Sequence, residues 1–305
     1  MLTAEPAPGP VDGLPRLPAW IRARPPAGSR YPEVRSILAE LRLGTVCREA
    51  RCPNLSECWS AGAATLMLLG TDCTRRCGFC AVTTHWPRGV VDRSEPARVA
   101  AAVRRWGLRY VVLTQVCRDD LDDGGASVLA DTVRAIRLES PDTLVELLIG
   151  DLGGQRAAVT TVVDAAPDVL AHNLETTRDL TPVVRDRRAG YDRSLDALRT
   201  ARAIGPPTLV TKSSIMLGLG ETSAGIDRAL RDLRHAGVEV LTIGQYLRPS
   251  PGHLPVDRFV PPEEFAALAA AAERIGFRGV ASGPLVRSSY RAEQLYRRAL
   301  AARGG

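Results

Sequence analysis

From residue 64 onward, short apolar runs alternate with amphipathic segments along the chain. The apolar runs are rich in β-branched residues, whereas the segments between them carry apolar residues at helical spacing. This alternation predicts parallel strands joined by right-handed helical crossovers. The predicted strands cover 64–70, 109–114, 144–150, 168–173, 209–217, 238–244 and 277–282. The predicted helices cover 95–106, 126–139, 154–165, 191–204, 223–236 and 262–275.

We therefore expect an α/β protein in which six βα units and a last strand form a partial (β/α)6 TIM-type barrel with extensions at both ends. In such barrels ligands gather at the C-terminal ends of the strands. The predicted regions are a flexible Pro-rich leader over 1–30, an N-terminal extension over 31–63 that opens with a helix over 31–46, the barrel over 64–276, and a C-terminal extension over 277–305.

Composition narrows the class of protein. Hydrophobic residues make up 45% and charged residues 24% of 305 residues, as in globular proteins. No apolar run reaches the roughly 18 residues that span a bilayer, and the first residues lack a signal-peptide pattern, so we expect a cytoplasmic protein with no membrane partner. The net charge of +6 comes from dispersed arginines, and aromatic residues are only 5%. Both observations argue against a nucleic-acid partner.

Six of the seven cysteines lie between residues 47 and 80, in two triplets. The first triplet is Cys47, Cys52 and Cys58, and the second is Cys73, Cys77 and Cys80. Disulfide frameworks are typical of short secreted domains, so metal ligation is the better interpretation here. Each triplet is one thiolate short of the four that close a tetrahedral metal site or a cubane iron–sulfur cluster.

The second triplet follows the first predicted barrel strand directly, which places it at the ligand-binding end of the barrel. Three thiolates on a [4Fe–4S] cluster leave one iron open for S-adenosylmethionine, and a zinc loop with a distant fourth ligand is the alternative. The CxxxCxxC spacing, with Phe79 before the last cysteine, resembles the signature of the radical S-adenosylmethionine superfamily.

The two triplets together, with motifs spread from about residue 31 to 295, resemble lipoyl synthase. The matching stretches are CPNLSECW (52–59), CTRRCGFC (73–80), RDDLDDGGA (118–126), HNLET (172–176), YDRSLDALR (191–199), MLGLGET (216–222), LTIGQYLRPS (241–250), PEEF (262–265) and SGPLVRSSYR (282–291).

This resemblance implies two [4Fe–4S] clusters and S-adenosylmethionine as cofactors. It implies that the first triplet holds an auxiliary cluster, capped by a serine of the RSSY motif, for which we expect Ser289 with Ser288 as the alternative. That cluster would be sacrificed as two sulfurs are inserted at C6 and C8 of an octanoyl-lysine. A C-terminal surface turn that binds an anion is the alternative interpretation of RSSY.

The resemblance also implies the partners. They are octanoylated lipoyl-carrier domains of 2-oxoacid dehydrogenase or glycine-cleavage proteins, a reducing electron donor, and an iron–sulfur carrier that rebuilds the auxiliary cluster.

Polar residues near the predicted strand ends are candidates for cofactor binding, and simple loop hydrogen bonding is the alternative. An inward-facing lysine within a strand would need an anionic partner. The candidates are Thr114, Asp119, Asn173, Glu175, Lys212 and Gln245.

Three positions depart from the pattern that lipoyl synthases usually show: Gln115, Cys117 and Gly150. They leave open a paralogue that inserts sulfur into another carrier-bound chain. A sulfur-inserting or methylthiolating enzyme acting on RNA and a non-catalytic metal-binding scaffold are the remaining alternatives, and the lack of an appended nucleic-acid domain counts against RNA.

Overall fold

The computed structural model describes residues 16–22 and 30–304. The predicted leader over 1–30 therefore falls largely outside the described residues.

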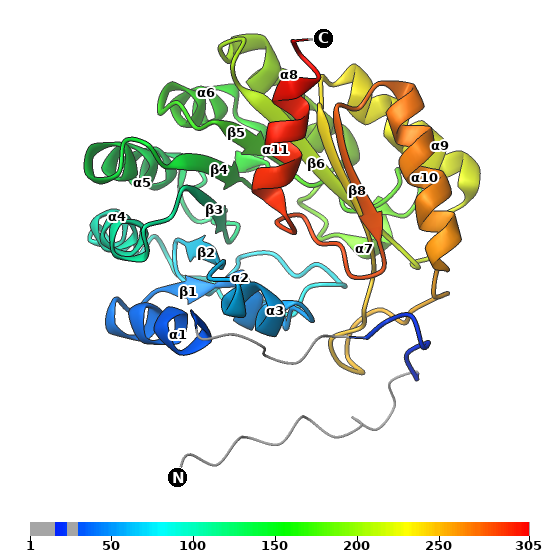
Figure 1. Cartoon of the computed structure of the whole chain (residues 1–305), viewed down its shortest axis with the longest axis horizontal. Coiled ribbons are helices and arrows are strands. Elements are labelled where there is room, and N and C mark those ends of the chain that lie inside the picture. Colours follow the sequence, from blue (N-terminus) through cyan, green and yellow to red (C-terminus); the bar gives the residue numbers. More distant parts are fainter. Residues whose placement is uncertain (1–15, 23–29, 305) are drawn as a thin grey trace.

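Within the described residues, eight strands form one sheet in the order of the chain (Figure 1). They are β1 (Gly44–Thr45), β2 (Thr65–Leu68), β3 (Tyr110–Gln115), β4 (Leu144–Leu148), β5 (Val169–Ala171), β6 (Val210–Leu217), β7 (Val240–Gln245) and β8 (Gly279–Gly283). Strands β2 to β8 are parallel, whereas β1 is antiparallel to β2. The predicted α/β class and the parallel strands are confirmed.

The helices after the barrel strands lie outside the sheet (Figure 1). They are α4 (Glu95–Trp106), α5 (Ala126–Glu139), α6 (Arg156–Asp164), α8 (Tyr191–Ile204), α9 (Ser223–His235) and α10 (Pro262–Ile275), while the short helix α7 (Thr181–Val184) lies in the segment after β5, next to the loop after β2. Helices α4, α5, α8 and α10 have the predicted bounds. In α4 the apolar face, including Val99, Val103 and Trp106, is buried, and the helix ends at Gly107 with a φ of 60°.

Several segments differ from the sequence-based prediction, among them the unpredicted short helix α7. The expected helix over 31–46 ends early as α1 (Arg30–Glu40), and the chain turns through β1 into α2 (Val46–Glu49) and α3 (Leu55–Ser60). The helix ends early because Gly44 and Thr45 pair with β2, and the Thr45 hydroxyl then accepts a hydrogen bond from Arg48 N at the start of α2. The helix α11 (Ala292–Ala301) was not predicted.

Helix α11 packs over the N-terminal end of the barrel. Leu295, Tyr296 and Ala299 share a buried cluster with the valines Val169, Val210 and Val240, each at or near the start of its strand. Inside this end of the barrel, Lys212 Nζ lies 2.6 Å from Glu146 Oε1, and both side chains are almost completely buried. The Tyr110 hydroxyl donates a 2.6 Å hydrogen bond to Glu146 Oε2. This end of the barrel is therefore filled.

We expect replacement of Lys212 by alanine to destabilise the protein by about 3–5 kcal/mol, because Glu146 would stay buried without its cation. Urea unfolding of both proteins measures the change. The double variant Lys212→Met/Glu146→Gln, which removes both charges, should recover most of the loss. A single-variant loss below about 1 kcal/mol would contradict the importance of this pair.

Candidate functional site

A cavity of about 460 Å³ lies at the C-terminal ends of the barrel strands. Its volume is in the range of small-molecule sites. Side chains of β2, β3, β4, β6 and β7 contribute to its walls, together with the loops that follow β2 and β5. Five of the six clustered cysteines line it, namely Cys47, Cys52, Cys73, Cys77 and Cys80. The fold therefore brings both triplets to one cavity.

Two short helices present the first triplet. Cys47 lies in α2 and Cys58 in α3, and Cys52 lies between them, with its N–H bonded to the Cys47 carbonyl at 3.0 Å. Burial, and then the neighbouring Cys47 and Cys52 sulfurs, raise the pKa of Cys58 to about 12. The three thiols are thus close enough to repel one another as thiolates, and a bound cation would relieve that repulsion.

The chain's C-terminal loop returns to this triplet. Asn54 Nδ2 donates a 2.6 Å hydrogen bond to the Leu285 carbonyl, and the Tyr290 hydroxyl lies 3.2 Å from Glu57 Oε1. Ser288 and Ser289 line the same cavity as Cys47 and Cys52. The approach requires Gly244 on β7, because a Cβ there would lie only 2.1 Å from the Val286 carbonyl oxygen.

The second triplet lies on the loop after β2. Backbone N–H groups donate to two of its sulfurs, from Arg75 to Cys73 and from Asp186 to Cys77, each at 3.4 Å. A hydrogen bond from the Cys117 thiol also lowers the pKa of Cys73, to about 6. These donors favour the thiolate, which is the metal-ligating form, although burial outweighs the Asp186 donor and raises the pKa of Cys77.

The Cys80 thiolate is also disfavoured by its surroundings. Burial, and then the charges of Cys77 and Cys73, raise the pKa of Cys80 to about 12. As in the first triplet, a bound cation would offset this repulsion.

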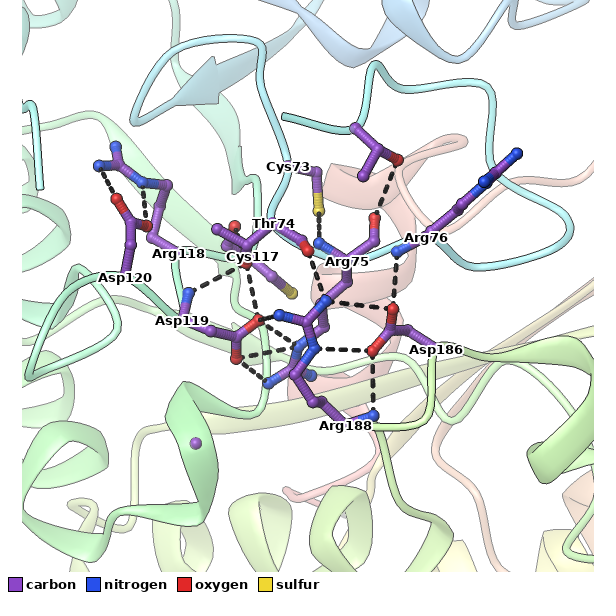
Figure 2. Close-up of polar contacts among 12 residues, drawn as sticks. Cys73, Thr74, Arg75, Arg76, Cys117, Arg118, Asp119, Asp120, Asp186 and Arg188 are labelled. Atoms are coloured by element: carbon purple, nitrogen blue, oxygen red, sulfur yellow. Dashed lines mark hydrogen bonds and ion pairs between the residues drawn. The ribbon is translucent and has the colours of Figure 1, made fainter. Parts of the chain in front are cut away.

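The Arg75 side chain anchors the loop that carries the second triplet (Figure 2). Its buried guanidinium lies 2.7 Å from Asp119 Oδ1 and 2.7 Å from Asp151 Oδ1, after β3 and β4 respectively. The Thr74 hydroxyl also donates to Asp119 at 2.7 Å. Burial opposes ionisation of Asp119, but the hydrogen bonds from Arg75 and Thr74 hold its pKa below the usual range. Asp119 therefore positions the loop and does not line the cavity.

Four buried polar atoms in residues of the cavity wall find no hydrogen-bond partner within the described residues. They are Gln115 Oε1, His172 Nε2, Asn173 Oδ1 and Arg185 Nε. The other ring nitrogen of His172 contacts the Ile149 carbonyl at 2.9 Å, and burial lowers the pKa of this histidine to about 4. Buried polar atoms are almost always hydrogen-bonded, so this group calls for a polar ligand or ordered water.

The other residues that the sequence suggested for cofactor binding either line the cavity or have a structural role. Thr114, Asn173 and Glu175 line the cavity, and burial raises the pKa of Glu175. Gln245 also borders the cavity, but its amide holds the loop after β7 by bonding the Arg258 carbonyl at 3.1 Å and Val260 N at 2.8 Å. The structure places Lys212 at the filled end of the barrel, away from the cavity.

Among the cavity-wall residues with unpartnered polar atoms, His172 and Arg185 were not singled out from the sequence. His172 directly precedes Asn173 in the HNLET stretch, so its position at the cavity could have been predicted from the sequence. Arg185 lies in an arginine-rich loop after α7 with no recognisable spacing, and nothing in the sequence marks it.

Gly150 lies next to Gln115 and Cys117, the other two positions expected to depart from the family pattern. A Cβ on Gly150 would lie 3.0 Å from Gln115 Nε2 and 3.2 Å from Cys117 Sγ. Both distances are shorter than ordinary van der Waals contact, so the absence of a side chain at 150 makes room for the two larger neighbours. Gly150 therefore lies against both residues in the cavity wall, and we predict that its missing side chain compensates for their size.

The donor set suits two iron–sulfur clusters and a polar cofactor. Each triplet supplies three thiols, and the unpartnered polar atoms suit a charged, hydrogen-bonding molecule. Within the described residues, no group of three or more His, Cys, Asp or Glu side chains is arranged to hold a single metal ion. None of the helices among these residues is long and apolar enough to cross a membrane.

Comparison with family models gives two matches. Residues 67–244 match the radical SAM superfamily. Residues 11–52 match the N-terminal domain of lipoyl synthase of the radical SAM family.

Comparison with curated proteins finds similarity over most of the chain. Lipoyl synthase of Thermus thermophilus is 56% identical over 293 residues, which cover 96% of this chain and 90% of that protein. Lipoyl synthase of Pyrobaculum arsenaticum is 56% identical over 289 residues, which cover 94% of this chain and 97% of that protein.

Solved structures share the fold at low identity. The FeFe-hydrogenase maturase HydG of Carboxydothermus hydrogenoformans has a TM-score of 0.58 at 14% identity, covering 88% of this chain and 68% of that one. Methylornithine synthase has a TM-score of 0.50 at 16% identity, covering 76% of this chain and 68% of that one. Both support the open barrel.

We expect Gly150→Ala to destabilise the protein by about 1 kcal/mol, because the added methyl group overpacks the wall. Adding Gln115→Ser should restore most of this loss, and urea unfolding of the single and double variants measures the coupling. Gly252→Ala is the matched control, since its Cβ would meet only Ser250 Oγ at 3.8 Å. Purely additive effects would contradict the compensation.

We also expect part of the acid sensitivity of stability to come from His172. Its pKa is lowered from 6.5 to about 4 on folding, so the unfolded chain binds more protons between these pH values. The free energy of unfolding therefore decreases as the pH is lowered from about 7 towards 4. Between pH 7 and 5 this loss amounts to about 2 kcal/mol. Urea unfolding of the reduced, cluster-free protein should show a smaller loss for His172→Gln, and equal losses would contradict the assignment.

Proposed function

The chain belongs to the lipoyl synthase family of the radical SAM superfamily, and from that premise we propose how its residues divide the work. As a lipoyl synthase it is a sulfurtransferase that acts on a lipoyl-carrier substrate with S-adenosylmethionine, a [4Fe–4S] cluster and a reductant. The proposal rests on one cavity that is lined by cysteines of both triplets and by the two serines of the RSSY loop.

Cys73, Cys77 and Cys80 hold the cluster that binds S-adenosylmethionine. When bound, this cluster and S-adenosylmethionine together supply the radical that removes hydrogen from an unactivated carbon. The backbone donors to Cys73 and Cys77 stabilise the thiolates, and Arg75 keeps the loop in place. The unpartnered polar atoms of the wall, from Gln115 to Arg185, orient the polar groups of the cofactor.

Cys47, Cys52 and Cys58 hold the auxiliary cluster, which is the sulfur donor and is consumed. Ser289 supplies the fourth ligand, with Ser288 as the alternative. The hydrogen bonds that hold the C-terminal loop against α3 and its N-cap residue support this assignment. A serine oxygen is a hard ligand beside thiolates, so its bond to iron is poorly matched, which suits a cluster that must be dismantled.

The octanoyl chain lies between the two triplets. Much of the cavity wall there is apolar, with Met67, Leu148, Ile215 and Val286 among its residues, which suits an alkyl chain. Two sulfurs enter at C6 and C8. The substrates are octanoylated carrier domains of 2-oxoacid dehydrogenase or glycine-cleavage proteins, the site of action is the cytoplasm, and an iron–sulfur carrier rebuilds the auxiliary cluster.

We expect the reconstituted enzyme to hold about eight irons and, with S-adenosylmethionine and reductant, to add two sulfurs to an octanoyl-lysine carrier peptide. Ser289→Ala should lower sulfur insertion at least about tenfold, a loss of about 1.4 kcal/mol or more, while 5′-deoxyadenosine still forms. Mass analysis of the peptide and chromatography of the nucleoside measure both.

Ser288→Ala tests the alternative ligand, and Ser223→Ala, an exposed serine at the start of α9, is the matched control. Normal sulfur insertion by both RSSY variants would contradict the serine-capped cluster. Formation of 5′-deoxyadenosine without sulfur gain in the unaltered enzyme would favour the paralogue, and tightly bound zinc in place of iron would favour the scaffold.

A further inference from the structure

A single layer of backbone separates Cys77 from an exposed surface. Asp186 N donates to Cys77 Sγ, and the next residue, Arg187, is exposed. Gly78 N bonds to the Val184 carbonyl at 2.9 Å, and the preceding Val183 is 66% exposed. The segment that touches the second triplet on its inner side thus faces solvent on its outer side.

The surface at this point combines apolar and basic side chains, and we name it the loop patch. Trp86 is 46% exposed, and the Arg188 guanidinium lies over its ring, 5.7 Å from the centroid. The Arg76 side chain points away from the Arg75 network (Figure 2). The loop patch consists of Arg76, Trp86, Val183, Arg187 and Arg188.

The loop patch carries unbalanced positive charge. Asp186, the acid at its centre, does not offer its charge to a partner. Its carboxylate accepts hydrogen bonds from Arg76 N and from Arg188 N and Nε, and its side chain is only 9% exposed. Burial opposes its ionisation, but these hydrogen bonds hold the pKa of Asp186 well below its usual range. Neither Arg76 nor Arg187 has a salt bridge to any other described residue, so both charges face solvent.

We propose that the loop patch is the docking surface for an acidic electron-carrier protein of low potential. This inference rests on the proposed function, in which the second triplet holds a cluster that must be reduced. A docked carrier would give one electron to the cluster that Cys73, Cys77 and Cys80 would hold. That electron would pass to the sulfonium of bound S-adenosylmethionine and cleave its C5′–S bond to methionine and a 5′-deoxyadenosyl radical, with no proton transferred.

The position of the loop patch supports this partner. S-adenosylmethionine and the substrate occupy the cavity side of the cluster, so the outer side is left for electron entry. Basic side chains steer an acidic protein and fix its orientation. Trp86 and Val183 add the aromatic and apolar contact that small transient interfaces use.

The test reverses two charges of the loop patch in Arg76→Glu/Arg187→Glu. The matched control is Arg228→Glu/Arg274→Glu, which makes the same charge change on exposed positions of α9 and α10. Formation of 5′-deoxyadenosine is measured in the cluster-loaded enzyme with saturating dithionite, and separately with a pre-reduced acidic flavodoxin or ferredoxin.

We expect the loop-patch variant to be slowed about tenfold with the protein carriers at low ionic strength, and to keep its rate with dithionite. The difference should vanish near 1 M salt, where the Debye length falls to about 3 Å. The control variant should keep its rate with both reductants. If the glutamate pair fails to load its cluster, Arg76→Gln/Arg187→Gln replaces it, with a smaller slowing expected.

Three results would overturn the loop patch as the docking surface. One is equal slowing of the loop-patch and control variants with the carriers. Another is an equal loss with dithionite and carriers, and the third is an unaltered enzyme that works with dithionite but with neither carrier. By contrast, an unaltered enzyme that forms no 5′-deoxyadenosine even with dithionite would overturn the proposed function itself.

Discussion

The buried guanidinium of Arg75 is the interaction on which the site depends. A charge in this position is tolerable only when it is paired and hydrogen-bonded, and Asp119 and Asp151 provide both. Because the arginine follows β2 and the two acids follow β3 and β4, the pairing ties the loop of the second triplet to three adjacent strand ends. The loop therefore has a defined shape before any ligand binds, and this preorganisation is what a redox site needs.

The two ends of the barrel have opposite roles because of what fills them. At one end the Lys212–Glu146 pair, Tyr110 and α11 occupy the interior. At the other end the strands open onto the cavity, and the chain after β8 passes over Gly244 to reach α3. Segments that precede β2 and follow β8 thus meet at one site, although more than 200 residues separate Asn54 from Leu285.

Periodicity predicted the elements that depend on burial of one face, such as α4 and α5. It failed at Gly44–Thr45, where a two-residue strand exists only because β2 lies beside it. Cysteine spacing led to the hypothesis of two metal sites, and the structure places five of the six cysteines around one cavity. The cost of burying a charge predicted that an inward-facing Lys212 needs an acid, and Glu146 is that acid. Sequence reasoning could not tell that Asp119 bonds to the loop after β2 and does not line the cavity, since a carboxylate at a strand end can do either. Arg185 was beyond prediction because only tertiary packing places it.

The two triplets differ in how firmly the protein holds them. Backbone donors reach Cys73 and Cys77, and the Arg75 ion pairs brace their loop, so its geometry is fixed by several buried charges. The first triplet stands on the short helices α2 and α3, and the C-terminal loop meets it through the contacts at Asn54 and Tyr290. The contacts at Asn54 and Tyr290 are hydrogen bonds, whereas ion pairs of a buried arginine hold the loop of the second triplet. That difference supports the proposal of a permanent cluster at the second triplet and a consumed cluster at the first.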